Sequence, residues 1–160
     1  FTPDLKPENV LLNQDYEIKL SDFGLARQLQ LDKESTSAHG GTKNYLAPEI
    51  LIAKEEQKQQ RLTKAVDIFA CGIMFFELLT HQHPFQQTSQ QTLYERIIHD
   101  EPDDIPLRYP EAMRNLIYAM LNKNPSERIT ADQILQIPEV ISKFEEIRQK
   151  EKEYEQKQGN

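Results

Sequence analysis

The segment Lys64–Thr80 constrains the fold of this chain more than any other, because it is apolar on nearly every side. Its hydrophobic residues are Ala65, Val66, Ile68, Phe69, Ala70, Ile73, Met74, Phe75, Phe76, Leu78 and Leu79. A helix without a polar face has to be covered by other elements, so we expect it at the centre of a domain. Asp67 lies in its first turn, where the helix dipole favours a negative charge.

The composition of the 160 residues, 38% hydrophobic and 28% charged, is typical of one globular domain. A net charge of −7 argues against a nucleic-acid-binding protein, which would present a basic face. No run of about 18 apolar residues occurs, so the sequence predicts no membrane span. The single cysteine, Cys71, excludes a disulfide framework and is typical of a small core residue. We therefore expect an intracellular protein, located in the cytoplasm.

Two short strand-like runs, Val10–Leu12 and residues 17–20, flank turn residues at 13–15 and predict a small hairpin. Residues 21–48 show no sustained periodicity and are expected to form a long loop, which in a compact domain is usually functional or disordered. Further helices are predicted at residues 90–99, at 111–121 after Pro110, from a capping box at Thr130 and Gln133, and in the charged tail at 142–158. The chain is thus expected to be mainly α-helical after one hairpin.

Four local patterns follow one another along the chain. Residues 4–9 read Asp-Leu-Lys-Pro-Glu-Asn, and residues 22–24 read Asp-Phe-Gly directly after the predicted hairpin. Residues 41–49 end in Ala-Pro-Glu. The fourth pattern is the start of the central helix at Asp67, with Arg128 farther along. Each pattern alone is weak, but their order and spacing together are specific.

The chemistry that these residue types suit is phosphoryl transfer, in which the protein mainly positions groups and neutralises charge. Asp4 can orient an attacking hydroxyl and accept its proton, and the ammonium of Lys6 can contact the moving phosphoryl oxygens. Asn9 and Asp22 supply the hard oxygen donors that Mg²⁺ prefers. Taken singly, each would be interpreted as an ordinary turn or loop residue.

The patterns together resemble the second half of a eukaryotic protein kinase domain. The resemblance covers roughly residues 1–138, and residues 139–160 are expected to form a separate charged helical tail. It implies a mainly α fold, the C-terminal lobe of a kinase with a small β-hairpin, with the N-terminal β-rich lobe missing. Lys6 following the acid, and Thr42, are similar to the serine/threonine branch. Residues 105–147 are similar to the NIMA-related kinases.

The resemblance also implies individual roles. Asp4 would be the catalytic base, Lys6 would contact the γ-phosphate of ATP, and Asn9 and Asp22 would ligate Mg²⁺. Residues 22–49 would form the activation segment, with Thr42 near the substrate-docking loop. The ion pair tying this segment to the helical lobe would join Glu49 to Arg128, and Asp67 would support the catalytic loop. The substrate would be a protein, and no nucleic acid or membrane partner is expected.

The chain departs from the family pattern at Thr2-Pro3, where kinases usually have His-Arg. The missing arginine normally pairs with a phosphate on the activation segment, and Pro3 has no N–H to donate to Asp67. Ser35, Thr36 and Ser37 are candidate phosphorylation sites, and their phosphate would need Arg27 or Lys33 as its cationic partner.

Two functions therefore remain open. The first is a serine/threonine protein kinase whose 160 residues are inactive alone, because they contain no glycine-rich loop and no lysine in a Val-Ala-Ile-Lys setting. The alternative is a pseudokinase or docking module that binds protein partners without turnover. His81 and His83 are interpreted as surface-loop residues rather than metal ligands, since no acid or cysteine clusters near them in the sequence.

Overall fold

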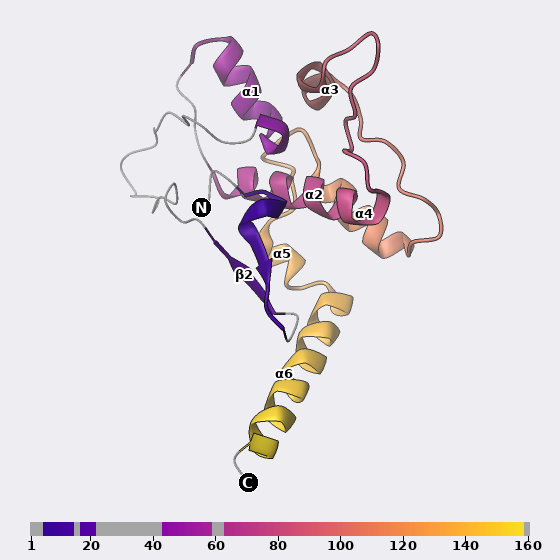
Figure 1. Cartoon of the computed structure of the whole chain (residues 1–160). Coiled ribbons are helices and arrows are strands. Elements are labelled where there is room, and N and C mark those ends of the chain that lie inside the picture. Colours follow the sequence, from indigo (N-terminus) through magenta and orange to yellow (C-terminus); the bar gives the residue numbers. More distant parts are fainter. Residues whose placement is uncertain (1–4, 15–16, 22–42, 59–62, 159–160) are drawn as a thin grey trace. The chain divides into compact units, whose positions relative to one another are not determined.

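The computed structural model describes residues 5–14, 17–21, 43–58 and 63–158 (Figure 1). It divides into two compact units, Phe1–Ile129 and Thr130–Asn160. The described part of the chain is mainly helical with one two-stranded sheet, which confirms the expected fold class. The sequence-based boundary between residues 138 and 139 stays a prediction.

The predicted hairpin is present. Strands β1 (Val10–Leu12) and β2 (Ile18–Leu20) pair antiparallel, with Leu11 opposite Lys19. Asn13 closes the turn, because its side-chain oxygen accepts the N–H of Glu17 at 2.8 Å and its own N–H donates to the Glu17 carbonyl at 3.1 Å. Asn13 therefore stabilises the turn that joins the two strands.

The central helix α2 (Lys64–Thr80) has the bounds that the sequence predicts. Phe69, Ile73 and Phe76 are at most 1% exposed and form the middle of the core of the first unit. The opposite face is not covered, since Phe75 is 43% and Leu78 70% exposed. The helix is therefore central to the core on one side and leaves apolar side chains exposed on the other.

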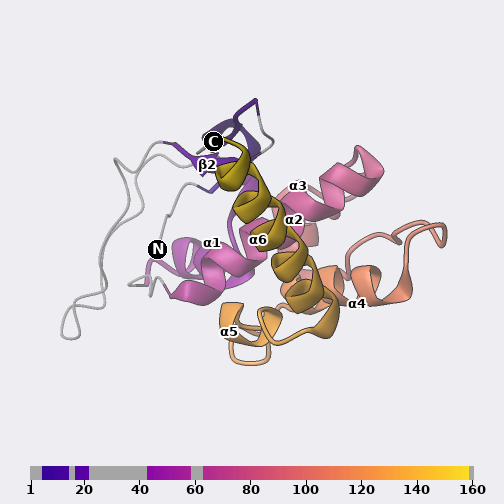
Figure 2. The ribbon, with the colours of Figure 1, turned by 90° about the horizontal axis from the view of Figure 1, so that it is seen from below.

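Helix α4 (Glu111–Met120) packs along α2, as both ribbon views show (Figure 1 and Figure 2). Gly72 makes the close approach possible, because a Cβ atom there would lie 3.0 Å from Met120 Cβ and from Leu121 Cδ2. Pro110 precedes α4 as expected, and its missing N–H costs nothing at a helix start.

Two helices differ from the sequence-based prediction. Helix α1 (Pro48–Glu55) begins where the predicted loop ends, and the sequence predicts no helix there. Helix α3 (Leu93–His99) begins three residues later than expected, because Thr92 caps it. The Thr92 hydroxyl accepts the N–H of Glu95, and the Glu95 carboxylate accepts the N–H of Thr92.

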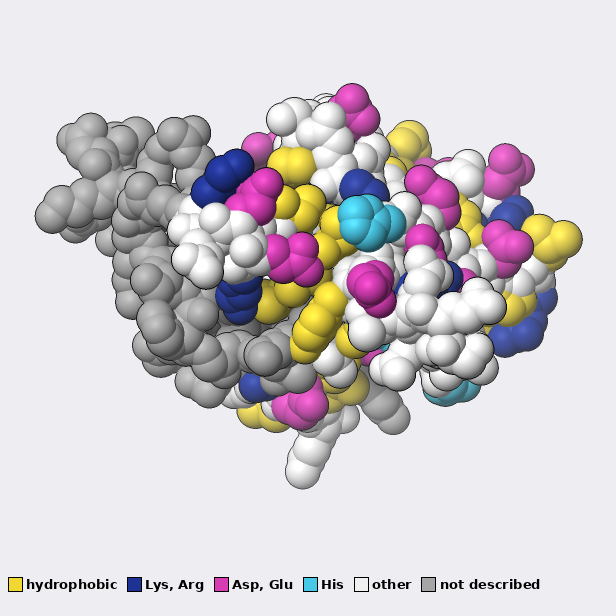
Figure 3. Space-filling view, turned by 90° about the horizontal axis from the view of Figure 1, so that it is seen from above, with side chains coloured by type: hydrophobic (Ala, Val, Ile, Leu, Met, Phe, Trp, Pro, Cys, Tyr) yellow, Lys and Arg dark blue, Asp and Glu magenta, His cyan; other side chains and the backbone are white. Residues whose placement is uncertain are grey.

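Helices α1 and α3 contact each other, and Figure 3 looks onto this side of the molecule from above. A strip of hydrophobic side chains lies there between acidic and basic ones. Ile50 of α1 and Ile97 of α3 are buried in the same core as Phe69. The short helices α1 and α3 are thus held by core side chains rather than by their length.

The second unit contains α5 (Ala131–Ile134) and α6 (Pro138–Gln158). The predicted capping box at Thr130 and Gln133 opens α5. Helix α6 begins four residues before the predicted tail helix, with proline at its first position, where the lack of an N–H is tolerated. Among the described residues no helix is long and apolar enough to cross a membrane.

Candidate functional site

Several residues of the predicted site lie outside the described part of the chain. These are Asp4, Asp22, Thr42, Ser35, Thr36 and Ser37. Their roles, and the approach of Asp4 to Asp22, therefore remain predictions. Thr2 and Pro3 also lie outside it.

Asn9 ends a short 3-10 helix, Pro7–Asn9, and is 9% exposed. Its carbonyl accepts the backbone N–H of Ser21 at 2.8 Å and the Ser21 hydroxyl at 3.2 Å. The N–H of Asn9 donates to the carbonyl of Lys6 at 3.0 Å. Because Ser21 directly precedes Asp22 in the sequence, the hairpin returns the chain to Asn9 at the residue before Asp22.

Glu49 and Arg128, which are 79 residues apart in the sequence, form a bidentate ion pair with N–O distances of 2.8 and 2.9 Å. The Arg128 side chain is fully buried and that of Glu49 is 20% exposed. The pair joins the first turn of α1 to the segment after α4.

The remaining donors of Arg128 are also used. Its guanidinium donates to the carbonyls of Ala65, Asn122 and Lys123. It also lies 4.9 Å over the ring of Phe69. A planar group with five N–H donors suits this position in a way that lysine could not.

Asp67 lies in the first turn of α2, as the sequence predicts, and is half-buried. Burial, with a smaller contribution from the Asp67 charge, raises the pKa of the Cys71 thiol to about 11. Cys71 is therefore a protonated, unreactive thiol on the central helix.

The short 3-10 helix η3 (Lys43–Tyr45) is tied to α2 and to the segment after it. The Tyr45 hydroxyl donates to the Glu77 carboxylate at 2.8 Å. Burial raises the pKa of Tyr45 well above its usual value, and the bond to Glu77 adds to this rise. Burial also raises the pKa of Glu77.

His83 lies in the loop after α2, as expected, and is partly buried there. Its Nδ1 accepts the N–H of Phe85 at 3.1 Å, and its Nε2 lies 3.0 Å from the carbonyl of Asn44. His81, by contrast, is exposed and ends α2 in the left-handed conformation, with φ of 58°. The neighbouring Pro84 and Phe85 are both fully buried.

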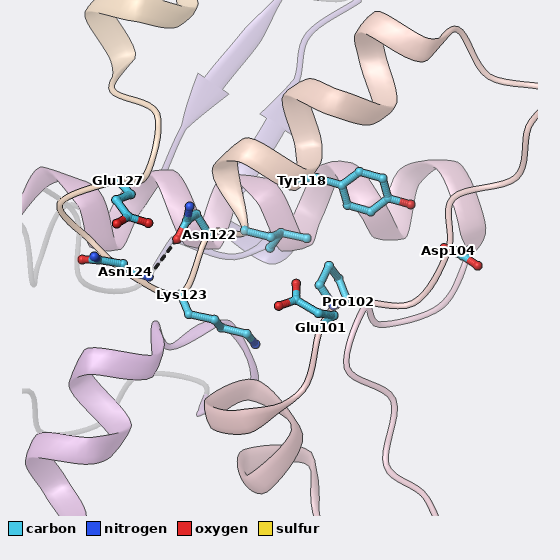
Figure 4. A pocket seen from close by; sticks show the side chains of 9 residues that line it. Glu101, Pro102, Asp104, Tyr118, Asn122, Lys123, Asn124 and Glu127 are labelled. Carbon is cyan, nitrogen blue, oxygen red and sulfur yellow. Dashed lines mark hydrogen bonds between the residues drawn. The ribbon is translucent and has the colours of Figure 1, made fainter.

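A cavity of about 490 Å³ lies between the segments around Pro102 and Lys123 (Figure 4). Its lining residues are Glu101, Pro102, Asp104, Tyr118, Leu121, Asn122, Lys123, Asn124 and Glu127. Figure 4 shows the side chains of Lys123 and Glu101 pointing toward one another. None of the residues predicted for phosphoryl transfer lines it.

Lys123 has a structural role at the edge of this cavity. Its amine donates to the Ile97 carbonyl at 2.5 Å, near the end of α3, and lies 3.5 Å over the Phe85 ring. Burial lowers the pKa of Lys123 to about 7. The partly buried amine therefore caps the C-terminal end of α3.

Within the described ranges, no three His, Cys, Asp or Glu side chains come together in a way that could hold a metal ion. Of the two predicted magnesium ligands, Asn9 and Asp22, the structure describes Asn9. Its burial beside Ser21 is compatible with an oxygen-donor site that Asp22 would complete.

Comparison with known proteins adds independent information. The profile of the protein kinase domain family matches residues 3–139. Calcium/calmodulin-dependent protein kinase type II of Caenorhabditis elegans is 40% identical over 147 residues, which is 88% of this chain. The type II alpha chain of Drosophila melanogaster is 41% identical over 142 residues, or 84% of this chain. The chain spans 19% and 26% of the length of these two relatives.

Proposed function

The chain belongs to the eukaryotic protein kinase family, in its serine/threonine branch, and from this we propose that it carries the catalytic and substrate-binding half of such an enzyme. The reaction would transfer the γ-phosphoryl group of ATP to a serine or threonine hydroxyl of a protein. Three of the similar kinases are named calcium/calmodulin-dependent protein kinase type II, and the NIMA-related assignment stays a prediction.

We assign the chemistry to four side chains. Asp4 orients the substrate hydroxyl and accepts its proton, and the Lys6 ammonium contacts the γ-phosphate. Asn9 and Asp22 would hold Mg²⁺, which neutralises phosphate charge when bound. All four residue types are present, whereas a module that only binds partners has no need of the full set.

The observation that supports this proposal most directly is the contact of Ser21 with the backbone carbonyl of Asn9. It brings the residue before Asp22 next to the other proposed magnesium ligand. The bidentate pair of Glu49 and Arg128 adds support, since it ties the end of the proposed activation segment to the helical core.

The 160 residues alone are expected to show no turnover, because they include no glycine-rich loop to cover the nucleotide. The test compares the chain with a chimera that joins it to the N-terminal lobe of an active serine/threonine kinase. Labelled phosphate should appear on serine or threonine of a protein acceptor with the chimera only. Turnover by the isolated chain that disappears in Asp4→Asn would contradict the expectation.

The docking-module alternative rests on one specific feature, Thr2-Pro3 in place of the usual His-Arg. Pro3 removes a possible hydrogen bond to Asp67, which costs about 1.5–3 kcal/mol for a charged acceptor. A chimera that binds ATP but transfers no phosphate, and gains turnover when Thr2-Pro3 is replaced by His-Arg, would favour this alternative.

A further inference from the structure

The cavity shown in Figure 4 combines apolar and acidic walls. Pro102, Tyr118 and Leu121 supply the apolar surface. The Tyr118 hydroxyl accepts the N–H of Ile105 at 2.8 Å, so its ring is held against the segment that follows α3. The volume of about 490 Å³ lies within the range of about 300–1,000 Å³ that is typical of ligand sites.

Three carboxylates line the same cavity, those of Glu101, Asp104 and Glu127, and all three residues are exposed. Among the residues that the structure describes, none of these side chains is hydrogen-bonded or within ion-pair distance of a basic group. Asp100 and Asp103, by contrast, are both paired with Arg96. The cavity thus contains carboxylates whose acceptors are not used within the described part of the chain.

The other polar groups of the lining are already engaged. The Asn122 side-chain oxygen accepts the N–H of Asn124 at 2.9 Å, and the Asn124 side-chain oxygen accepts the N–H of Ser126 at 3.0 Å. The Lys123 amine donates to the Ile97 carbonyl at 2.5 Å. Although Lys123 points toward Glu101 in Figure 4, it offsets one of three negative charges, so the cavity favours a positively charged ligand.

The arrangement of the carboxylates distinguishes between kinds of cation. Within the described ranges, no three acidic, histidine or cysteine side chains approach one point closely enough to hold a metal ion. Carboxylates that are spread around a cavity suit a larger cation with several donors. The guanidinium of arginine has five N–H donors in one plane, and its methylene stem can pack against apolar surface such as Leu121 and Tyr118.

We propose that this cavity binds an arginine side chain of a protein partner. The guanidinium would donate to the carboxylates of Glu101, Asp104 and Glu127, while the methylene stem would lie against Leu121. None of the residues assigned to phosphoryl transfer lines the cavity, so this recognition needs neither ATP nor catalysis. It can therefore be measured on the full 160-residue chain.

The test is an NMR titration of the chain with the peptide acetyl-Ala-Ala-Arg-Ala-Ala-amide in about 0.15 M salt. Amide signals of residues 101–104 and 121–127 should shift, with a dissociation constant on the order of 1 mM for so small a ligand. The same peptide with citrulline, which has the shape of arginine without its charge, should cause no shift. A lysine peptide should bind more weakly, because it lacks the planar group.

The double variant Glu101→Gln with Glu127→Gln should weaken binding of the arginine peptide about fivefold or more, since it removes two of the three charges. Glu139→Gln with Glu145→Gln is the matched control, because it changes the net charge equally at exposed positions of α6 that do not line the cavity. That control should bind as the unmodified chain does.

Equal shifts with the citrulline or lysine peptide, or shifts elsewhere in the chain only, would overturn the proposal. Equal weakening in the two double variants would also overturn it, because the attraction would then reflect net charge alone. Failure of phosphoryl transfer in the chimera would reject the proposed function and leave this result unchanged.

Discussion

Arg128 combines complete burial of its charge with the use of every donor, so its removal cannot be compensated by water. Glu49 would be left with a largely buried carboxylate, and three backbone carbonyls would lose their partner. Breaking one side of such a pair is costly even where the intact pair adds little net stability.

We therefore expect Arg128→Met to lower the free energy of unfolding by about 3–5 kcal/mol, measured by urea denaturation. Lys143→Met is the control, because it breaks an ion pair with Glu146 in which both side chains are well exposed. That variant should leave the unfolding midpoint unchanged. Equal effects of the two substitutions would show that the buried pair has no special role.

Lys123 gives a prediction about pH. Its pKa is lowered to about 7 in the folded chain, against about 10.4 for an unfolded chain. Between these values the unfolded chain binds more protons, so stability should rise with pH from about 7 to 10. In Lys123→Met this rise should be smaller, whereas the exposed control Lys64→Met should retain it. Identical slopes of the urea midpoint against pH in both variants would refute this assignment.

At the scale of elements, the packing of α2 against α4 depends on a glycine. In Gly72→Ala the new methyl group would lie 3.0 Å from Met120 Cβ, which sits on the rigid stem of a helix residue. Overpacking of this kind costs about 1–3 kcal/mol, and the better helix propensity of alanine returns up to about 1 kcal/mol. We expect a net loss of stability of about 1 kcal/mol in thermal or urea unfolding. A more stable variant would show that the two helices can separate freely.

The helices that begin or pack through a local sequence signal were predicted from the sequence. The apolar run of α2, Pro110 before α4 and the capping box at Thr130 each act within one turn of helix. Helix α1 has only eight residues and no clear apolar periodicity, because its position is fixed by burial of Ile50 and by the ion pair of Glu49. A helix that is stabilised mainly by tertiary contacts has no periodic pattern by which its sequence would reveal it.

The candidate site shows the same division between local and distant information. The pairing of Glu49 with Arg128 could be expected only from the family resemblance, because the two residues are far apart in the chain. The bond of Tyr45 to Glu77 and the contact of His83 with Asn44 were not expected, since they join η3 to segments more than 30 residues away. Turn-forming residues such as Asn13, by contrast, act on near neighbours.

At the scale of the whole molecule, the proposed function requires Asp4, Lys6, Asn9 and Asp22 to lie together in one phosphoryl-transfer site. The described part supplies Lys6, Asn9 and the hairpin that returns to Ser21, together with a helical core anchored by Arg128. Phe75 and Leu78 of α2 are exposed and form an apolar surface. Another part of a larger kinase domain could cover this surface.

The measurement that tests the central claim most directly is the rate of phosphate transfer to a protein acceptor by the chimera and its variants. Asp4→Asn removes the proposed base and should lower kcat by about 10²–10⁴, and Asp22→Asn should raise the Mg²⁺ concentration needed for activity. The exposed Asp132→Asn is the control and should leave the rate unchanged. Full activity in both Asp4→Asn and Asp22→Asn would contradict the account.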